Sequence, residues 1–242
     1  MMNKPFGAGF PKTPPSAVIG VRSPDPVQRT QSLKIISRSY WKPIYKYVRL
    51  RWRKPPAEAE EITQEFFARA LERTTFQSYD PGQARFRTFV RMCVDRLVVD
   101  MDRQHLAKKR GGEVTLLRLD FGLAEEEIER EAPVADPEAV FDAEWVKSLV
   151  ETAVESLRTV CEREGRKVHF RAFELFHLRD DAERSTYETI ASTLGISIGD
   201  VNNRLSYARR EFRAALLEAL RDCTGSEQEM QDEARIVLGL SL

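Results

Sequence analysis

The sequence has few of the residues that catalysis and metal binding require. Its 242 residues include three histidines and three cysteines, with no Cys-x-x-Cys pair and no His-Glu-x-x-His motif. It also contains no phosphate-binding glycine loop and no Gly-x-Ser-x-Gly nucleophile motif. We therefore expect a protein that is not an enzyme, holds no metal and uses no cofactor.

Long apolar runs and strand-like alternation are also missing. No stretch of about 18 consecutive apolar residues occurs, and the N-terminal segment lacks an apolar core of signal-peptide length. Hydrophobic residues make up 42% of the chain and charged residues 31%, which is typical of a soluble helical protein. We expect an all-α, cytoplasmic protein with no membrane contact, whose three separated cysteines stay reduced.

The chain lacks net charge, yet its charges are unevenly distributed. Residues 1–54 carry twelve Lys or Arg and one acid, and residues 85–110 carry eight Lys or Arg with three acids. Residues 120–144 reverse the balance, with ten Asp or Glu and one Arg. A neutral total can therefore conceal a basic binding face and an acidic connector.

Helical periodicity and helix-breaking residues predict how the chain is divided. Six of the twelve prolines fall within residues 1–26, which predicts a disordered leader, and Pro43 should kink or split the first long helix. The predicted fold is all-α, with two small helical domains joined by an acidic flexible linker. The predicted segments are a leader (1–26), a three-helix domain (27–110), an acidic linker (111–137), a helix-turn-helix domain (138–222) and a tail helix (223–242).

Residues 186–212, "TYETIASTLGISIGDVNNRLSYARREF", predict a helix-turn-helix that begins at Tyr187. Gly195 suits the tight turn, because a left-handed backbone angle is cheap only for glycine, and Ser197 can cap the second helix. Helical spacing buries residues such as Val201 and Leu205. The polar residues left at the start and on the outer side of the second helix are Ser197, Asp200, Asn202, Asn203, Ser206, Tyr207, Arg209, Arg210 and Arg213.

A second helix of this kind can enter the major groove of DNA. Asn side chains can pair with adenine through two hydrogen bonds, and arginines can bind guanine or phosphate. Two helices packed across a glycine turn also occur in ordinary helix bundles, so plain packing remains the alternative. DNA binding is the favoured interpretation of this stretch.

Residues 85–110 place basic and aromatic side chains on one predicted helix. Phe86 and Phe89 are interleaved with Arg85, Arg87, Arg91, Arg96 and Arg103. Such a surface can hold a phosphate backbone and stack unpaired bases. In the alternative, the two phenylalanines belong to the core and the arginines are solvated, and both interpretations stay open.

Together these stretches resemble the extracytoplasmic-function (ECF) sigma factors of bacterial RNA polymerase. Residues 58–73, "EAEEITQEFFARALER", resemble the region 2.2 helix, which docks on the polymerase clamp. Residues 79–103 resemble regions 2.3 and 2.4, which melt and read the −10 promoter element, and residues 186–212 resemble region 4, which reads the −35 element. The motifs "TQEFFARALER", "ARFRTFV" and "AKKRGG" look most like a subgroup with a longer linker before region 4.

The resemblance implies partners and site residues. The partners would be promoter DNA and core RNA polymerase, through the clamp of its beta-prime subunit, with an anti-sigma factor or another regulator left open. The free protein would be monomeric. The polymerase contact would come from Glu61, Gln64, Glu65 and Phe66, and the −35 contact from the polar residues of 197–213 named above. The −10 contact would come from Phe86, Arg87, Phe89, Arg91, Asp100, Arg103, Lys108, Lys109 and Arg110.

Alternative functions stay open. A dimeric helix-turn-helix regulator would also bind DNA through residues 186–213, but it would not need the helices at 58–73 and 85–110. A sigma-like interaction module would keep the fold without reading promoters, and the neutral net charge and Asp200 leave room for it. The acidic linker would either thread toward the polymerase active-site channel, as sigma linkers do, or serve as a solvated spacer.

Overall fold

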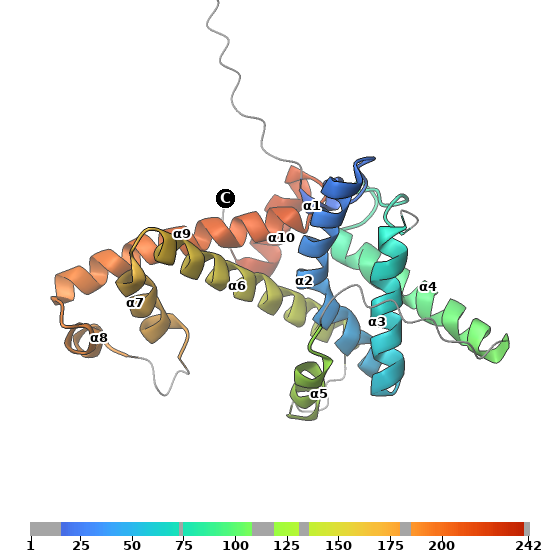
Figure 1. Ribbon diagram of the computed structural model, residues 1–242, viewed down its shortest axis with the longest axis horizontal. Coiled ribbons are helices and arrows are strands. Elements are labelled where there is room, and N and C mark those ends of the chain that lie inside the picture. Colours follow the sequence, from blue (N-terminus) through green and yellow to red (C-terminus); the bar gives the residue numbers. More distant parts are fainter. Residues whose placement is uncertain (1–15, 73–74, 108–118, 131–135, 180–184, 240–242) are drawn as a thin grey trace, which may run out of the picture.

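The computed structural model describes residues 16–72, 75–107, 119–130, 136–179 and 185–239. In these ranges the chain forms helices joined by turns and contains no strand, which confirms the predicted all-α fold (Figure 1). Within the same ranges, no helix has both the length and the hydrophobicity that crossing a bilayer requires. The helices are α1 (Ala17–Gly20), α2 (Pro26–Arg51), α3 (Pro56–Leu71), α4 (Phe86–Ala107), α5 (Phe121–Arg130), α6 (Pro137–Arg163), α7 (Lys167–His177), α8 (Tyr187–Leu194), α9 (Ile198–Asp222) and α10 (Glu227–Leu238).

Helix α2 is the centre of the larger part of the molecule, which we call the body. Asp25 caps α2 by accepting a hydrogen bond from the Val27 amide (3.0 Å), and Pro26 occupies the first turn, where its missing N–H is harmless. The helix continues through Pro43 to Arg51 instead of splitting there. Helices α1, α3, α4, α5 and α6 all pack against it.

Helices from both predicted domains meet in the core of the body. Tyr40 of α2 is fully buried, and its ring centroid lies 5.6 Å from that of Phe86 in α4. On its other side, Phe141 and Trp145 of α6 lie 6.3 and 6.2 Å away. Burying a large apolar side chain contributes roughly 2 kcal/mol, and the first half of α6 gains this only against the body. The segments predicted as two separate domains therefore share one core.

Part of the predicted disordered leader is ordered. The side chain of Ser16 caps α1 and donates a hydrogen bond to the carbonyl oxygen of Thr224 (2.8 Å). Ala17 and Val18 are buried in the body core. Residues 16–26 therefore belong to the body, and residues 1–15 lie outside the described residues.

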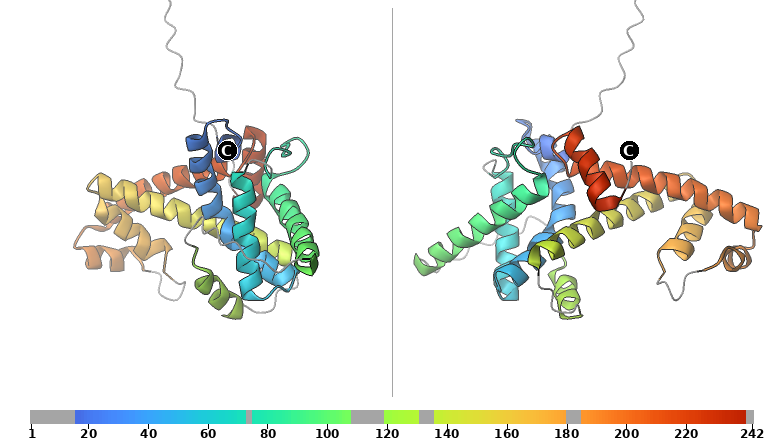
Figure 2. Two further views of the ribbon diagram at one scale, coloured as in Figure 1. Left: turned by 45° about the vertical axis from the view of Figure 1, so that its right-hand side comes forward. Right: turned by 180° about the vertical axis from the view of Figure 1, so that it is seen from behind.

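Helices α6 and α9 leave the body side by side and form an arm (Figures 1 and 2). Trp145 and Leu149 of α6 lie in the body core, whereas Leu157 and Cys161, further along the same helix, pack with Phe173 of α7. Helices α7 and α8 lie at the far end of the arm. The arm thus connects the body to a distal helix-turn-helix.

The predicted acidic linker contains a docked helix, α5. The ring of Phe121 lies 5.1 Å from that of Tyr45 in α2, and the Tyr45 hydroxyl donates to Glu125 (2.6 Å). Glu125 also accepts from Arg49 Nε (2.9 Å). Residues 120–130 are therefore not a solvated spacer in this conformation, because their acids face the basic residues of α2.

A buried ion cluster anchors α5 more firmly. The side chain of Lys46 is completely buried, and its Nζ lies 2.9 Å from carboxylate oxygens of both Glu127 and Glu144. Lys42 binds the same Glu127 at 3.0 Å. Burial alone would raise the pKa of Glu127, but hydrogen bonds from Lys46 and Lys42 outweigh it and hold the pKa at about 2. The acid therefore stays ionised against α2.

Candidate nucleic-acid interface

The turn of the helix-turn-helix has the predicted geometry. Helix α8 begins at Tyr187 behind a Thr186 cap, and Gly195 ends it with φ +64° and ψ 38°, in the left-handed region. Ser197 caps α9, as predicted, and Asp200 completes a reciprocal capping box. The local sequence therefore fixes the angle at which α9 leaves the turn.

The predicted inner face of this unit is buried. Ile190 of α8 and Val201 and Leu205 of α9 are fully buried, together with Ala172 and Leu175 of α7. Because these apolar side chains point inward, the opposite side of α9 is left to solvent. This packing confirms the predicted register of the second helix.

The predicted −35 residues divide into an exposed set and a set held in contacts with neighbouring groups. Asn202, Asn203, Ser206, Arg210 and Arg213 are exposed on α9. They recur along one side of the helix at spacings of three and four residues, so they form a single outward stripe. We call these five residues the α9 stripe.

Ser197 and Asp200 are engaged in the cap. The Asp200 carboxylate accepts from the Ser197 hydroxyl (2.8 Å) and pairs with Arg204 (3.1 Å). Hydrogen bonds from Ser197, with a smaller contribution from Arg204, lower the pKa of Asp200. Its negative charge is therefore compensated locally, which reduces the repulsion that an acid at this place would exert on phosphate.

Tyr207 and Arg209 are held against neighbouring helices. The Tyr207 hydroxyl donates to Glu164 (2.8 Å), and this hydrogen bond raises the pKa of Tyr207 to about 12. Arg209 Nε donates to Nε2 of His177 (3.0 Å), and its guanidinium lies 5.1 Å from the Phe176 ring centroid. Both side chains are half-buried and tie α9 to its supports.

The aromatic residues predicted to hold the −10 strand lie in the core. Phe86 is 0% exposed and Phe89 is 7% exposed. Their rings lie 5.1 and 5.2 Å from Tyr79, and Phe86 also contacts Phe76 at 5.4 Å. In this conformation neither ring is free to stack on a base, so the core alternative describes their surroundings.

The arginines next to these rings are paired with acids. Arg87 is 8% exposed, and its Nε donates to Glu233 of α10 (2.8 Å), while its Nη1 binds Asp142 of α6. Arg91 binds Asp142 (2.7 Å) and Glu138 (3.2 Å). Burial alone would lower the pKa of Arg87, but Asp142 and Glu233 outweigh it and raise it above the usual value. These two cations are therefore satisfied within the chain.

The opposite side of α4 is open. Met92, Arg96, Asp100 and Arg103 are exposed at spacings of four, four and three residues, which places them on one stripe. We call these four residues the α4 stripe. Beside it lies a hollow of about 210 Å³, lined by Phe66, Arg69, Thr75, Ser78, Cys93, Arg96, Leu97 and Asp100. The predicted Lys108, Lys109 and Arg110 lie outside the described residues.

Helix α3 presents a row of acids. Glu58 and Glu61 are exposed on its outer side, with Gln64 and Glu65 half-buried beside them, and Glu65 pairs with Arg69 (2.7 Å). Phe66, which was predicted to join this contact, is 1% exposed and packs on Phe67 and Phe76 at centroid distances of 5.2 and 6.0 Å. Its size and apolar character place it in the core, so the surface offers only the polar members of the predicted set.

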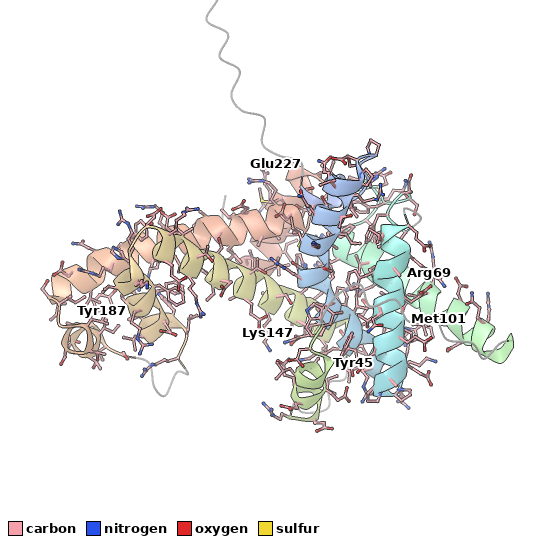
Figure 3. The ribbon with its side chains drawn as sticks, in the orientation of Figure 1. Tyr45, Arg69, Met101, Lys147, Tyr187 and Glu227 are labelled. Atoms are coloured by element: carbon pink, nitrogen blue, oxygen red, sulfur yellow. The ribbon has the colours of Figure 1, made fainter. Side chains whose placement is uncertain are left out.

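Sequence reasoning missed two groups of residues. Met92 and Arg69 were not selected, and Arg96 was placed on the basic helix but not in the −10 set, although the spacing of four residues between Met92, Arg96 and Asp100 identifies one face of a helix. Glu229 and Glu233 of α10 were also missed, and they flank the buried Met230 and Ala234. Acids on the apolar side of an amphipathic helix are a readable signal of a buried charge pair. Figure 3 labels Arg69 in the body and Tyr187 at the far end of the arm.

Metal chemistry finds no support in the described ranges, where no group of three or more His, Cys, Asp or Glu could hold an ion. A comparison with protein-family models matches residues 49–218 to the model described as ECF sigma factor. The match covers well over half of the chain, includes α3, α4 and the helix-turn-helix, and ends before α10. No curated protein and no solved structure matches the chain.

Proposed function

Because the chain belongs to the ECF sigma factor family and thus to the proteins of transcription initiation, we propose that it binds core RNA polymerase and directs it to specific promoters. It would do so in the cytoplasm, as a monomer when free and without catalysing a reaction itself. The two DNA contacts would come from the α9 stripe and from α4, and the polymerase contact from α3.

The observation that carries this proposal is the α9 stripe on a correctly capped helix-turn-helix. The first turns of such a second helix face base edges in the major groove. Asn202 and Asn203 are the exposed amides there, and each can pair bidentately with adenine. Arg210 and Arg213 lie further along, where phosphate contacts fix the docking register.

We propose the α4 stripe as the surface for the opened −10 strand. Arg96 and Arg103 can hold phosphates, and Met92 offers an exposed apolar contact (43% exposed). The hollow of about 210 Å³ beside Arg69 and Arg96 would receive one unstacked base. Phosphate contacts to Arg96 and Arg103, together with burial of the base, would offset part of the few kcal/mol that opening a base pair costs.

For the polymerase contact we propose the acidic row of α3. Glu61 and Glu65 lie about one helical turn apart and would meet a basic helix of the clamp. The double change Glu61→Lys and Glu65→Lys should weaken binding to core polymerase by at least tenfold in pull-down or interferometry. Glu151→Lys with Glu155→Lys, two exposed acids on α6, is the matched control and should leave binding unchanged. Equal losses in both variants would contradict this assignment.

Run-off transcription tests the whole proposal. Purified bacterial core polymerase would be given this protein and a library of promoter fragments with randomised upstream sequence. We expect discrete transcripts that require the protein, enriched in two common motifs. If the protein binds polymerase but yields no transcripts, the sigma-like interaction module is favoured, and failure to bind polymerase would favour the dimeric regulator.

The α4 assignment has its own control. Arg96→Ala with Arg103→Ala should reduce open-complex formation by about tenfold or more, measured by permanganate reactivity of unpaired thymines. Arg130→Ala with Arg163→Ala removes the same charge from exposed positions on α5 and α6 and should have no effect. Normal opening in the first variant would contradict the assignment.

A further inference from the structure

The C-terminal segment folds back onto the body and covers the start of α4. Helix α10 follows α9 after a short turn, and the view from behind in Figure 2 shows it against the body. Met230 and Ala234 join the body core, so the segment is packed rather than trailing. Gly225 allows this approach, because a Cβ there would lie 2.5 Å from Tyr79 Cε1.

Glu229 of α10 binds three groups around the first turn of α4. Its carboxylate accepts from the backbone amide of Phe86, the first residue of α4 (2.5 Å). It also accepts from the hydroxyl of Tyr79 (2.7 Å) and from the Gly225 amide (2.7 Å). An acid at a helix N-terminus stabilises the free amides there. A residue from the end of the chain therefore caps the helix that carries the predicted −10 residues.

Glu233 binds the arginine next to that cap. Its side chain is completely buried, and Oε1 lies 2.8 Å from Arg87 Nε and 3.6 Å from Arg85 Nε. Asp142 of α6 takes the other end of the Arg87 guanidinium. Carboxylate and phosphate oxygens bind arginine with the same fork geometry. Glu233 and Asp142 therefore occupy the positions that DNA phosphates would take on Arg87.

This contact is specific but weakly held. Glu233 Oε2 is buried and has no hydrogen-bond partner among the described residues, and the same is true of the Tyr40 hydroxyl. Removing a carboxylate from water costs several kcal/mol, which Arg87, shared with Asp142, and the longer contact with Arg85 repay only in part. Loss of the Glu233 charge would leave Arg87 with Asp142 alone, so the pair holds the closed state while adding little net stability. The segment is therefore suited to an interface that forms and breaks.

We propose that residues 223–238 form an autoinhibitory clasp, which binds Arg87, Tyr79 and the first amide of α4 until DNA displaces it. The proposal rests on the proposed function, because it assumes that α4 contacts DNA. The family match ends at residue 218, so the clasp lies beyond the part of the chain that the match covers. The α4 stripe stays exposed in the closed state, so the clasp withholds only the contact made by the start of α4, and the apparent affinity of that contact falls with the fraction of molecules in which the clasp is open.

The test compares two charge-neutralising variants of α10 in the full chain. The opening variant, Glu229→Gln with Glu233→Gln, removes both buried charges. Its matched control, Glu227→Gln with Asp232→Asn, removes two charges from the outer side of the same helix. The probe is fluorescently labelled single-stranded DNA of randomised sequence, and binding is followed by anisotropy. We expect the opening variant to bind about tenfold more tightly than the wild type and the control.

Hydrogen exchange reports the clasp directly. Backbone amides of 227–238 should exchange faster in the opening variant, and in the wild type they should do so when the single-stranded DNA is added. Amides of α8 should not change. If the first variant fails to fold, Gly225→Ala is the second, because its added Cβ would clash with Tyr79 and open the same contact. Gly122→Ala in α5 is its control.

The outcomes separate the two proposals. If the opening variants and the wild type bind DNA equally while Arg96→Ala with Arg103→Ala weakens binding, then α4 contacts DNA and the clasp is overturned. If α10 stays protected from exchange in the DNA-bound wild type, the clasp is overturned as well. If no variant binds DNA even with α10 open, α4 does not bind DNA. The clasp is then overturned too, because there is no DNA binding for it to inhibit.

Discussion

The two surfaces that we propose to face DNA carry similar residues in different surroundings. At the far end of the arm, Asn202, Ser206 and Arg210 reach solvent from a helix whose other side is buried. At the start of α4, Arg87 and Arg91 are as basic, yet acids from α6 and α10 bind them. The two surfaces therefore differ in whether acids from other helices reach their polar side chains, and not in the types of residue that they carry.

Sequence separation explains why one surface was predictable and the other was not. The capping box of the helix-turn-helix joins Ser197 to Asp200, three residues away. Arg87, in contrast, is bound by Asp142 at a separation of 55 residues and by Glu233 at 146. A motif that is completed by its own neighbours can be read from its sequence, and one completed by distant segments cannot.

The largest effect should come from breaking the small core of the helix-turn-helix. Leu205→Ala removes a fully buried side chain and should destabilise this unit by about 3 kcal/mol. Native-state hydrogen exchange should show lost protection in α7 and α8 but not in α4, because the body has a separate core. Ser206→Ala, on the exposed side, is the control. Equal loss in α4 would mean that the two ends unfold together.

Changing one exposed residue of α9 and one that contacts neighbouring helices should sharpen the distinction between the two sets of side chains. Asn202→Ala should cost roughly 1–3 kcal/mol of binding to the preferred −35 duplex and little on scrambled duplexes. Arg209→Ala should weaken both duplexes alike and lower stability, because Arg209 supports α9 through His177. Fluorescence titration with the two duplexes measures both. If both variants lose the same affinity on each duplex, Asn202 and Arg209 do not differ in role.

A fall in pH should weaken the attachment of α5 to the body. The pKa of Glu127 is about 2 in the folded state, below its ordinary value of 4.5, so its contribution to stability is full above pH 4.5. That contribution, on the order of 2 kcal/mol for this partly exposed group, should disappear as the pH falls from 4.5 to 2. Hydrogen exchange of α5 at pH 6 and pH 3 checks this.

The charge of Glu127 itself provides the control for that measurement. Glu127→Gln should reduce the pH dependence of α5 protection, since α5 then has no carboxylate against Lys46, whose other partner, Glu144, lies on α6. Glu126→Gln changes an exposed neighbour and should keep the dependence. A dependence that is undiminished by Glu127→Gln would assign it to Glu125 and Arg49 instead.

The smallest effect concerns the turn. Gly195→Ala places a side chain at φ +64° with open space around it, so only backbone strain remains, and we expect a loss of about 1 kcal/mol. Gly199→Ala, inside α9, should instead gain up to about 1 kcal/mol from helix propensity. Thermal unfolding of the distal unit distinguishes the signs. A loss of stability in both variants would mean that the position of Gly199 also tolerates only glycine.

Much of the fold was accessible from the sequence. The bounds of α3, α7 and α8 follow from apolar spacing and from breakers such as Pro55 and Gly195. Helix α5 was missed because its acids suggested a solvated linker, although Phe121, Ala124 and Ile128 lie on one face. The ion pairs of α4 could not be found, because 38 acids and 38 bases allow too many pairings.

The unbroken course of α9 has a geometric consequence. It runs for 25 residues from the helix-turn-helix into the body, where Leu216 and Leu220 join the core. That length is about 38 Å, or about 11 base-pair steps of duplex. One residue inserted between Arg213 and Leu216 would turn the distal unit by about 100° and shift it by about 1.5 Å. If the distal unit and the body each bind one promoter element, as proposed above, the length and rotation of α9 would set the distance between the two elements and the side of the duplex on which each lies.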